Sequence, residues 1–358
     1  MPAAYPPVVS SIKALGYISD VNGIGYSRDI GRCFALGGHH WIVFGDTFCK
    51  NADGDFVGLT NNTAALLHDK APNDLHLKSI VGSELPVSKY REIRKDDVVK
   101  PFIPFQVGEV PSPDSGDRIV LWNFGGCVEL EDKTGRVWFE KSLLHADNSS
   151  VYCGMGVAKV TVHDEKLVVE RVRGELEFGL VFGPDEPRVG SFSTLIHGNF
   201  VYLWSNFNDN IILARTHRCV TVLAGAYMYW NGKDYVPDYN EAVPIQDINN
   251  AGIVQGGVFR SHLFGEKKSF LLIGVDKFVD SKIQLGVAEN VEGPWEIHEL
   301  GLATGIDKTD GFIYCIYPLL WRSNTKKGEL MVTWSEQYPG GVIAARIQFD
   351  MEEHKDEL

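Results

Sequence analysis

The stretch Trp41-Ile-Val-Phe-Gly-Asp46, followed by Thr63-Ala-Ala-Leu-Leu67, sets out a pattern that recurs along the chain. In each copy an apolar run ends in a polar or acidic residue, and a second strand rich in small residues follows after a turn. The other apolar runs span residues 119–123, 201–206, 270–276 and 330–336. Copies spaced by roughly 60 to 80 residues indicate repeated supersecondary units. Five copies predict a five-bladed β-propeller.

One domain accounts for the whole chain, residues 1–358. No Pro- or Ser-rich linker interrupts the five repeats. Runs of β-branched and aromatic residues end in Gly, Asn or Asp turns, which is typical of strands, and no stretch keeps a helical period over three turns. We therefore expect an all-β, single-domain propeller. Its first strand, near residues 12–18, should pair with the last, near residues 342–349, to close the ring.

Composition excludes several classes of partner. The formal charge of −13 argues against nucleic acid, which requires clustered Lys and Arg; the one cationic stretch, residues 89–95, is interpreted as a solvated loop. Apolar runs fall far short of the ~20 residues of a membrane-spanning helix, so we expect a soluble protein without membrane contact. The sequence does not determine the oligomeric state.

Six cysteines occur without any C-x-x-C pair, which argues against a zinc site. A disulfide between Cys33 and Cys49 and buried free thiols are both compatible with the sequence. No phosphate-binding or dinucleotide-binding motif is present, and we expect neither a metal nor another cofactor.

Signals for cellular location disagree. The chain ends in Lys355-Asp-Glu-Leu358, the address that retains proteins in the endoplasmic reticulum, and Asn61 and Asn148 begin N-glycosylation sequons. The N-terminus, Met1-Pro-Ala-Ala-Tyr5, has neither the charged nor the apolar segment of a signal peptide. The sequence as written favours the cytoplasm. The lumen of the endoplasmic reticulum is the alternative if a signal peptide has been removed.

Three N-terminal phrases resemble a known group of proteins. Tyr26-Ser-Arg-Asp-Ile-Gly31, the segment from Trp41 to Thr47, and Asn61-Asn-Thr-Ala-Ala-Leu66 resemble the opening of five-bladed propellers close to the arabinanase-like glycosidases, a group that includes microbial endo-D-arabinanases. The resemblance spans all five repeats. It implies carboxylates at the inner strand ends that flank the scissile bond, one as base or nucleophile and one as acid. A shared fold does not by itself dictate the chemistry.

The residue that closes each apolar run is the candidate for the active centre. The resemblance assigns the first carboxylate to Asp46, and the later copies end in Asn123, Asn206, Asp276 and Glu336. Because an amide cannot transfer a proton near neutral pH, the second and third copies depart from the pattern. We predict Asp46 and Glu336 as the catalytic pair, with Asp276 in support.

The predicted substrate-binding residues are mainly aromatic and amide side chains. His39 and His40 are adjacent on a strand, so at most one of them can face the pocket. The predicted set is Arg28, His39, Trp122, Asn123, Trp204, Asn206, Tyr314 and Trp334.

These residues are compatible with three functions, and all three place a small molecule or glycan in the central pocket. The first is a glycoside hydrolase that acts on a furanoside or related small glycan. The second is a non-hydrolytic enzyme of natural-product biosynthesis (a cyclase, a pericyclase such as a Diels–Alderase, an isomerase or a lyase), in which Asn123 and Asn206 orient the substrate. The third is a propeller that binds sugar without catalysis.

Overall fold

The structure is a computed structural model that describes residues 1–20, 25–51, 53–68, 78–81, 99–107, 109, 116–147, 149–276, 280–306, 312–337 and 340–352. The cationic stretch 89–95, the sequon residue Asn148 and residues 355–358 lie outside the described residues. All six cysteines carry free thiols, so Cys33 and Cys49 form no disulfide. In the described part of the chain, no helix is long and apolar enough to cross a membrane.

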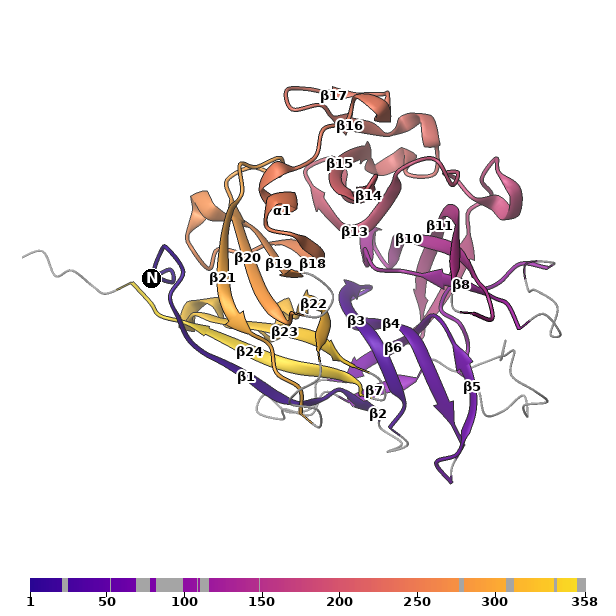
Figure 1. Cartoon of the computed structure of the whole chain (residues 1–358), viewed down its shortest axis with the longest axis horizontal. Helices are drawn as coiled ribbons and strands as arrows, with labels where there is room; N and C mark the ends of the chain where they lie inside the picture. Colours follow the sequence, from indigo (N-terminus) through magenta and orange to yellow (C-terminus); the bar gives the residue numbers. More distant parts are fainter. Residues whose placement is uncertain are drawn as a thin grey trace, which may run out of the picture.

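Five sheets form the blades of a propeller around a central axis (Figure 1). The innermost strands are β3 (Ser27–Leu36), the pair β8 (Arg118–Trp122) and β9 (Cys127–Glu131), β13 (Arg188–His197), β18 (Ile253–Arg260) and β22 (Ile313–Pro318). The second strands are β4 (His39–Lys50), β10 (Thr134–Leu144), β14 (Phe200–Phe207), β19 (Phe270–Asp276) and β23 (Glu329–Glu336).

The outer strands complete each blade. Blade 1 continues with β6 (Thr63–His68), β7 (Lys78–Val81) and β2 (Ser19–Asp20), and β5 (Phe56–Thr60) pairs with β4; blade 2 continues with β11 (Ser150–His163) and β12 (Lys166–Arg171). Blade 3 continues with β15 (Asn210–His217), β16 (Met228–Trp230) and β17 (Tyr235–Val236), and blade 4 with β20 (Lys282–Ala288) and β21 (Glu296–Leu302). One short helix, α1 (Gln246–Asn250), precedes β18.

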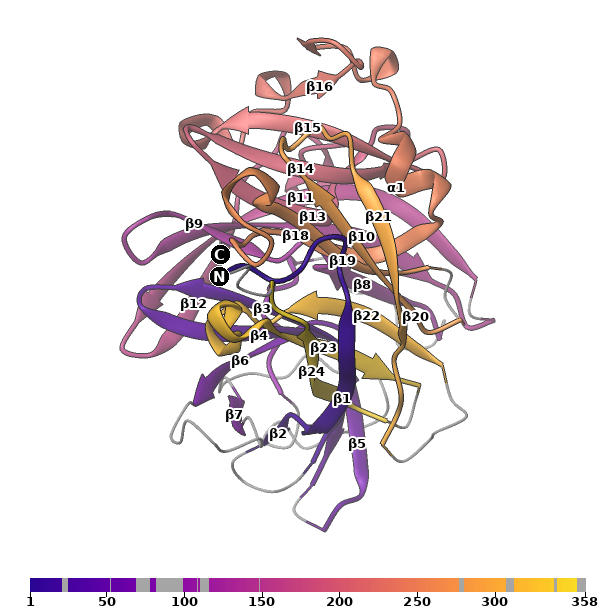
Figure 2. The ribbon, with the colours of Figure 1, turned by 90° about the vertical axis from the view of Figure 1, so that its left-hand side faces the viewer.

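The two ends of the chain share blade 5, as predicted. Its outer strands are β24 (Val342–Phe349) and β1 (Val9–Tyr17), which pair antiparallel from Val9 opposite Phe349 to Tyr17 opposite Ile343. Both views place β1 along β24 (Figures 1 and 2). The pairing closes the ring, and the predicted five-bladed propeller is confirmed.

The repeated apolar run corresponds to the second strand of a blade in four copies, which corrects the expectation that it forms the inner strand. Those runs lie in β4, β14, β19 and β23, and their small-residue partners lie in β6, β15, β20 and β24. A second strand is covered by a neighbouring blade on both faces, so it reads as a continuous apolar run. The innermost strands border the axis and are richer in Gly and polar residues, as in Val254-Gln-Gly-Gly257.

The core consists of apolar clusters between adjacent blades. Trp204 packs with blade 4 residues such as Leu272, and Trp334 packs with Ile273 and Ile343. Both tryptophans are 0% exposed. Truncating such a side chain to alanine typically costs about 3–5 kcal/mol.

A buried guanidinium at the axis joins the innermost strands. Arg32 of β3 is 6% exposed. Its Nη1 donates to the backbone oxygens of Phe124 (3.1 Å), Phe192 (3.3 Å) and Gly256 (3.1 Å). Its Nη2 donates to Ser193 Oγ at 3.0 Å. These acceptors belong to blades 2, 3 and 4.

Blade 5 completes the surroundings of Arg32, whose guanidinium lies 4.8 Å from the centre of the Tyr317 ring. Burial lowers the pKa of Arg32 to about 10, so the group stays charged at neutral pH. A side chain at Gly126 would come within 2.5 Å of Arg32 Nε, which explains the glycine there. One side chain therefore contacts all five blades.

We predict that Arg32→Met lowers the free energy of unfolding by at least ~3 kcal/mol, because each buried acceptor left without a donor costs about 1–3 kcal/mol. Thermal unfolding measures this. The matched control is Arg346→Met on β24, where the arginine is half-exposed and bonded to Glu329 at 3.5 Å; loss of such a surface pair costs at most ~1 kcal/mol. Equal losses in the two variants would contradict the axial role of Arg32.

Candidate active site

Two aspartates of blade 1 approach each other across neighbouring strands. Asp29 lies in β3 and Asp46 in β4. The backbone N–H of Asp46 donates to the Asp29 carboxylate. A Cβ on Gly45 would clash with Asp29 Oδ1, so the glycine before Asp46 lets the two chains approach. The two carboxyl groups act on each other electrostatically, as the pKa of Asp29 shows.

A bulge in β3 aims Asp29 at its partner. The register between β3 and β4 shifts on both sides of Ile30, and Ile30 adopts a φ of 66°. This left-handed conformation is unfavourable for a β-branched residue. Cys315 of β22, in the same buried cluster as Ile30, has a φ of 54°. Bulges and backbone strain of this kind concentrate where a side chain must be re-aimed.

Asp29 holds a proton near neutral pH. Burial, and then the charge of Asp46, raises its pKa from 3.8 to about 7. The Tyr314 hydroxyl donates to Asp29 Oδ2 at 3.2 Å and opposes part of this shift. Asp29 Oδ1 has no hydrogen-bond partner in the described part of the structure. Two close carboxyl groups that cannot both ionise easily are an arrangement for acid–base chemistry.

Blade 2 fixes the Asp46 carboxylate. Arg118 Nη2 lies 3.2 Å from Asp46 Oδ2, and Trp122 Nε1 donates to Asp46 Oδ1 at 3.4 Å. Both partners come from β8. The arginine forms a direct ion pair with Asp46, whereas its charge only partly offsets the burial that raises the pKa of Asp29.

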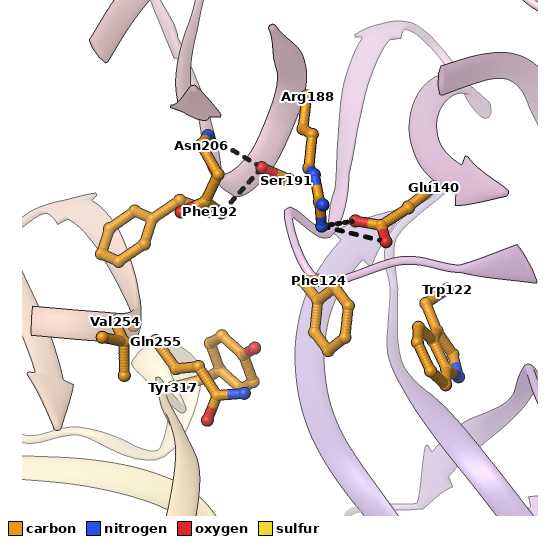
Figure 3. Close-up of a pocket in the computed structure, with 11 residues that line it drawn as sticks. Trp122, Phe124, Glu140, Arg188, Ser191, Phe192, Asn206, Val254, Gln255 and Tyr317 are labelled. Carbon is orange, nitrogen blue, oxygen red and sulfur yellow. Dashed lines mark hydrogen bonds and ion pairs between the residues drawn. The ribbon is translucent and has the colours of Figure 1, made fainter. Parts of the chain in front are cut away.

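Trp122 connects the aspartate pair to a cavity at the axis. The cavity has a volume of about 210 Å³. Figure 3 shows aromatic and polar side chains converging on it. The lining residues are Trp122, Phe124, Glu140, Arg188, Ser191, Phe192, Asn206, Val254, Gln255, Gly256 and Tyr317. Three of them, Phe124, Phe192 and Gly256, supply the carbonyl groups that accept hydrogen bonds from Arg32.

Glu140 and Arg188 form the charged wall of the axial cavity. Arg188 Nη1 lies 3.2 and 3.3 Å from the two oxygens of Glu140, and Ser142 Oγ donates to Glu140 Oε1 at 3.0 Å. Burial raises the pKa of Glu140 against the effect of Arg188. On the facing wall, Asn206 donates from its backbone N and Nδ2 to Ser191 Oγ. The cavity thus offers fixed donors and acceptors to a polyhydroxylated ligand.

Four predicted site residues gather here. Trp122 and Asn206 line the cavity, and Asp46 and Tyr314 belong to the carboxyl cluster. Glu336 is 1% exposed and accepts hydrogen bonds from the Tyr17 hydroxyl and from Ile306 N at 2.9 Å.

Nine of the eleven predicted residues, among them Glu336, Asp276 and Arg28, are absent from the described lining of the cavity. Asp276 is buried at the end of β19. Arg28 is buried with its guanidinium over the rings of Tyr26 and Phe44, at 4.9 and 4.5 Å.

Four predictions of substrate contact are corrected by the packing. Trp204 and Trp334 fill the cores between blades. Asn123 is buried and holds the loop after β8, donating from Nδ2 to Trp138 O at 2.7 Å. His39 begins β4 seven residues before Asp46, which places it about 23 Å away at the opposite end of the strand. Its ring packs edge-on against Trp41.

Sequence reasoning missed Asp29, Glu140 and Arg188. Asp29 stands in the quoted phrase Tyr26–Gly31, but nothing in a linear pattern shows its contact with Asp46. The repeat pattern could have identified Glu140, because Val137-Trp-Phe-Glu140 is an apolar run that ends in an acidic residue. This run forms the second strand of blade 2, so Glu140, and not Asn123, is the structural counterpart of Asp46.

The described residues contain no group of three or more His, Cys, Asp or Glu placed to hold a metal ion. No family model matches the sequence. A search of curated proteins by sequence finds no match.

Solved structures match over almost the whole chain. A Bacteroides ovatus protein, whose hydrolase activity is inferred, has a TM-score of 0.58 at 13% identity. The match covers 94% of this chain and 87% of the Bacteroides chain. The exo-β-1,3-galactanase of Phanerochaete chrysosporium, solved with β-1,3-galactotriose, has a TM-score of 0.51 at 9% identity, covering 96% and 67%. A GH43_1 enzyme of Xanthomonas citri, solved with xylose, has a TM-score of 0.50 at 11% identity, covering 92% and 90%.

The protein shares the propeller fold of these glycoside hydrolases. At such identities the likeness concerns the fold alone, and the predicted resemblance to arabinanase-like propellers is confirmed at that level. The chemistry has to be argued from the side chains around Asp29 and Asp46.

We predict that Asp29→Asn raises the melting temperature by a few °C at pH 8, and that the gain shrinks as the pH falls to 4. The folded-state pKa of Asp29 is raised to about 7. The folded state therefore binds the Asp29 proton more tightly than the unfolded state does. The resulting stabilisation is fully present below the unfolded pKa near 4 and is lost as pH rises through about 7. Asparagine stays neutral throughout. The exposed Asp132→Asn should show no such trend, and a pH-independent difference at Asp29 would contradict the assignment.

Proposed function

We propose that the protein is a glycoside hydrolase that cleaves a furanoside or related small glycan at the pair Asp29 and Asp46. The observation that carries the proposal is the electrostatic coupling of these two carboxyl groups, which raises the pKa of Asp29 to about 7 together with burial. Trp122, which donates to Asp46, joins the pair to a cavity lined by polar and aromatic side chains. Glycoside hydrolysis requires two carboxyl groups in different protonation states next to the bond that breaks. The cavity of about 210 Å³ is smaller than sites for drug-sized ligands and suits one sugar ring.

Asp29 acts as the proton donor in this proposal. Its neutral form gives a proton to the oxygen that leaves with the departing sugar, while the bond from that oxygen to the anomeric carbon breaks. Asp46 is the partner carboxylate, base or nucleophile, that stabilises the positive charge on the sugar ring. Water supplies the hydroxyl group that ends on the anomeric carbon. The Tyr314 hydroxyl, 3.2 Å from Asp29 Oδ2, keeps the donor in place.

The cavity positions the sugar ring. Trp122 and Tyr317 offer apolar faces to the C–H surface of a sugar, and Glu140, Arg188 and Asn206 offer partners for its hydroxyl groups. Solved propellers of the same fold hold galactotriose and xylose, which supports a sugar as the ligand. No observation favours the cyclase, isomerase or lyase hypothesis, and binding without catalysis is an outcome of the test below.

We predict that Asp46→Asn and Asp29→Asn each lower kcat/KM at least ~10³-fold, because each removes one half of the acid–base pair. The substrates are arabinofuranose, xylose and β-1,3-galactose oligosaccharides, with product measured as reducing ends. Asp132→Asn, in an exposed turn, is the control. Saturable binding without product from any substrate would overturn hydrolysis in favour of a sugar-binding propeller.

Glu336→Gln separates this assignment from the catalytic pair predicted by sequence. Ile306 N and the Tyr17 hydroxyl donate to different oxygens of Glu336. In the glutamine variant the amide oxygen can accept from Ile306 N and the NH2 group can donate to the Tyr17 oxygen, so a structural role predicts that activity falls less than ~10-fold. A loss as large as that of Asp46→Asn would restore Glu336 as the second catalytic carboxylate.

We predict that kcat/KM of the wild-type enzyme falls about ten-fold per pH unit above pH 7, because the acid form of Asp29 disappears above its pKa of about 7. Steady-state kinetics between pH 5 and 9 on the best oligosaccharide measure this. Activity that stays constant to pH 9 would contradict Asp29 as the proton donor.

A further inference from the structure

A second, larger cavity adjoins the axial one. It has a volume of about 620 Å³, and its lining includes Tyr152, Glu186, Arg188, Asn206 and Asp209. Arg188 and Asn206 also line the axial cavity. The two spaces therefore meet at these two side chains. The larger space, which we call the outer cavity, extends over the ends of strands of blades 2 and 3.

Arg188 contributes to both spaces. On the axial side its Nη1 is bonded to Glu140, and on the outer side its guanidinium lies 4.4 Å from the centre of the Tyr152 ring. Its side chain remains 43% exposed. Held between a carboxylate and an aromatic ring, it can still donate to a ligand that passes from one cavity to the other.

The far wall of the outer cavity is preformed. Asn208 and Asp209 make the turn between β14 and β15 with φ values of 47° and 60°, and Asn210 Nδ2 donates to Asn208 O at 2.7 Å. In the same lining, Glu186 Oε2 accepts from Gly183 N at 2.6 Å. A ligand entering this space meets fixed groups, which reduces the entropy lost on binding.

The chemistry of the lining suits a chain of sugars. Carboxylates of Glu186 and Asp209 and the amide of Asn206 accept or donate hydrogen bonds to hydroxyl groups, and Tyr152 offers a ring to pack against. The outer cavity has about three times the volume of the axial one. It can therefore hold more than one further unit when the axial cavity holds the first.

We propose that the outer cavity binds the sugar units joined to the one in the axial cavity, so that the enzyme acts on oligosaccharides of three or more units in preference to disaccharides. The inference rests on the proposed hydrolase function. Asp209 and Tyr152 determine the preference for length, and Arg188 bridges the two cavities.

The test compares Asp209→Gly with wild type on arabinofuranose, xylose and β-1,3-galactose oligosaccharides of two to five units. Glycine accepts the φ of 60°, so the turn survives while the carboxylate is removed. The matched control is Asp164→Gly, in the exposed turn between β11 and β12 with a φ of 46°. Kinetics give kcat/KM, and calorimetry on the Asp46→Asn background gives Kd.

We expect wild-type kcat/KM to rise at least ten-fold from two to four units. In Asp209→Gly this ratio should fall at least five-fold, and in Asp164→Gly it should not change. Hydrolysis with no dependence on length, or an unchanged ratio in Asp209→Gly, overturns the outer binding site while the hydrolase proposal stands. Length-dependent binding that Asp209→Gly weakens, without any product, supports the site and overturns hydrolysis. Neither binding nor product overturns both.

Discussion

The guanidinium of Arg32 is the interaction on which the geometry of the axis depends. A buried charge is costly unless its donors are satisfied, and here carbonyl oxygens of three other blades satisfy them. The inner segments of blades 2, 3 and 4 must therefore stay at hydrogen-bonding distance from one side chain of blade 1. Phe124, Phe192 and Gly256 turn their carbonyl groups toward the guanidinium and also line the axial cavity. The contacts that hold the blades together therefore also shape the wall of the site.

The fold could be predicted from the sequence because second strands are buried on both faces. Their apolar runs, with small-residue partners, make the period visible, and the closing pair β1 and β24 follows from ring closure. Blade 2 shows where the pattern misleads. The short strand β8 is as apolar as a second strand, so the repeat pattern matches residues 119–123 to the run ending at Asp46 and misses the true counterpart, which ends at Glu140. Apolar character alone does not distinguish an inner strand from its neighbour.

The site was predictable only in part, for a physical reason. Asp46 and Trp122 are found by position, since the ends of strands meet near the axis. The proton-holding character of Asp29 arises from burial and from Asp46, and their contact depends on a bulge at Ile30 that places a β-branched residue at positive φ. The backbone preference of isoleucine disfavours a positive φ, so no rule based on a single sequence would predict this bulge. Trp204 and Trp334 show the opposite error, because the sequence pattern predicts that they contact substrate, whereas they fill the cores between blades.

Closure of the ring by the two chain ends has a consequence for assembly during synthesis. Blade 5 needs both β1 and β24, which are far apart in the sequence, so the ring is incomplete until β24 has left the ribosome. Asp29 and Asp46 are then already present in blade 1, while Tyr314 is among the last parts to arrive. A nascent chain carries an open sheet edge through most of its translation, and such edges invite pairing with other chains. Chaperone protection of β1 until β24 emerges would suit this order of events.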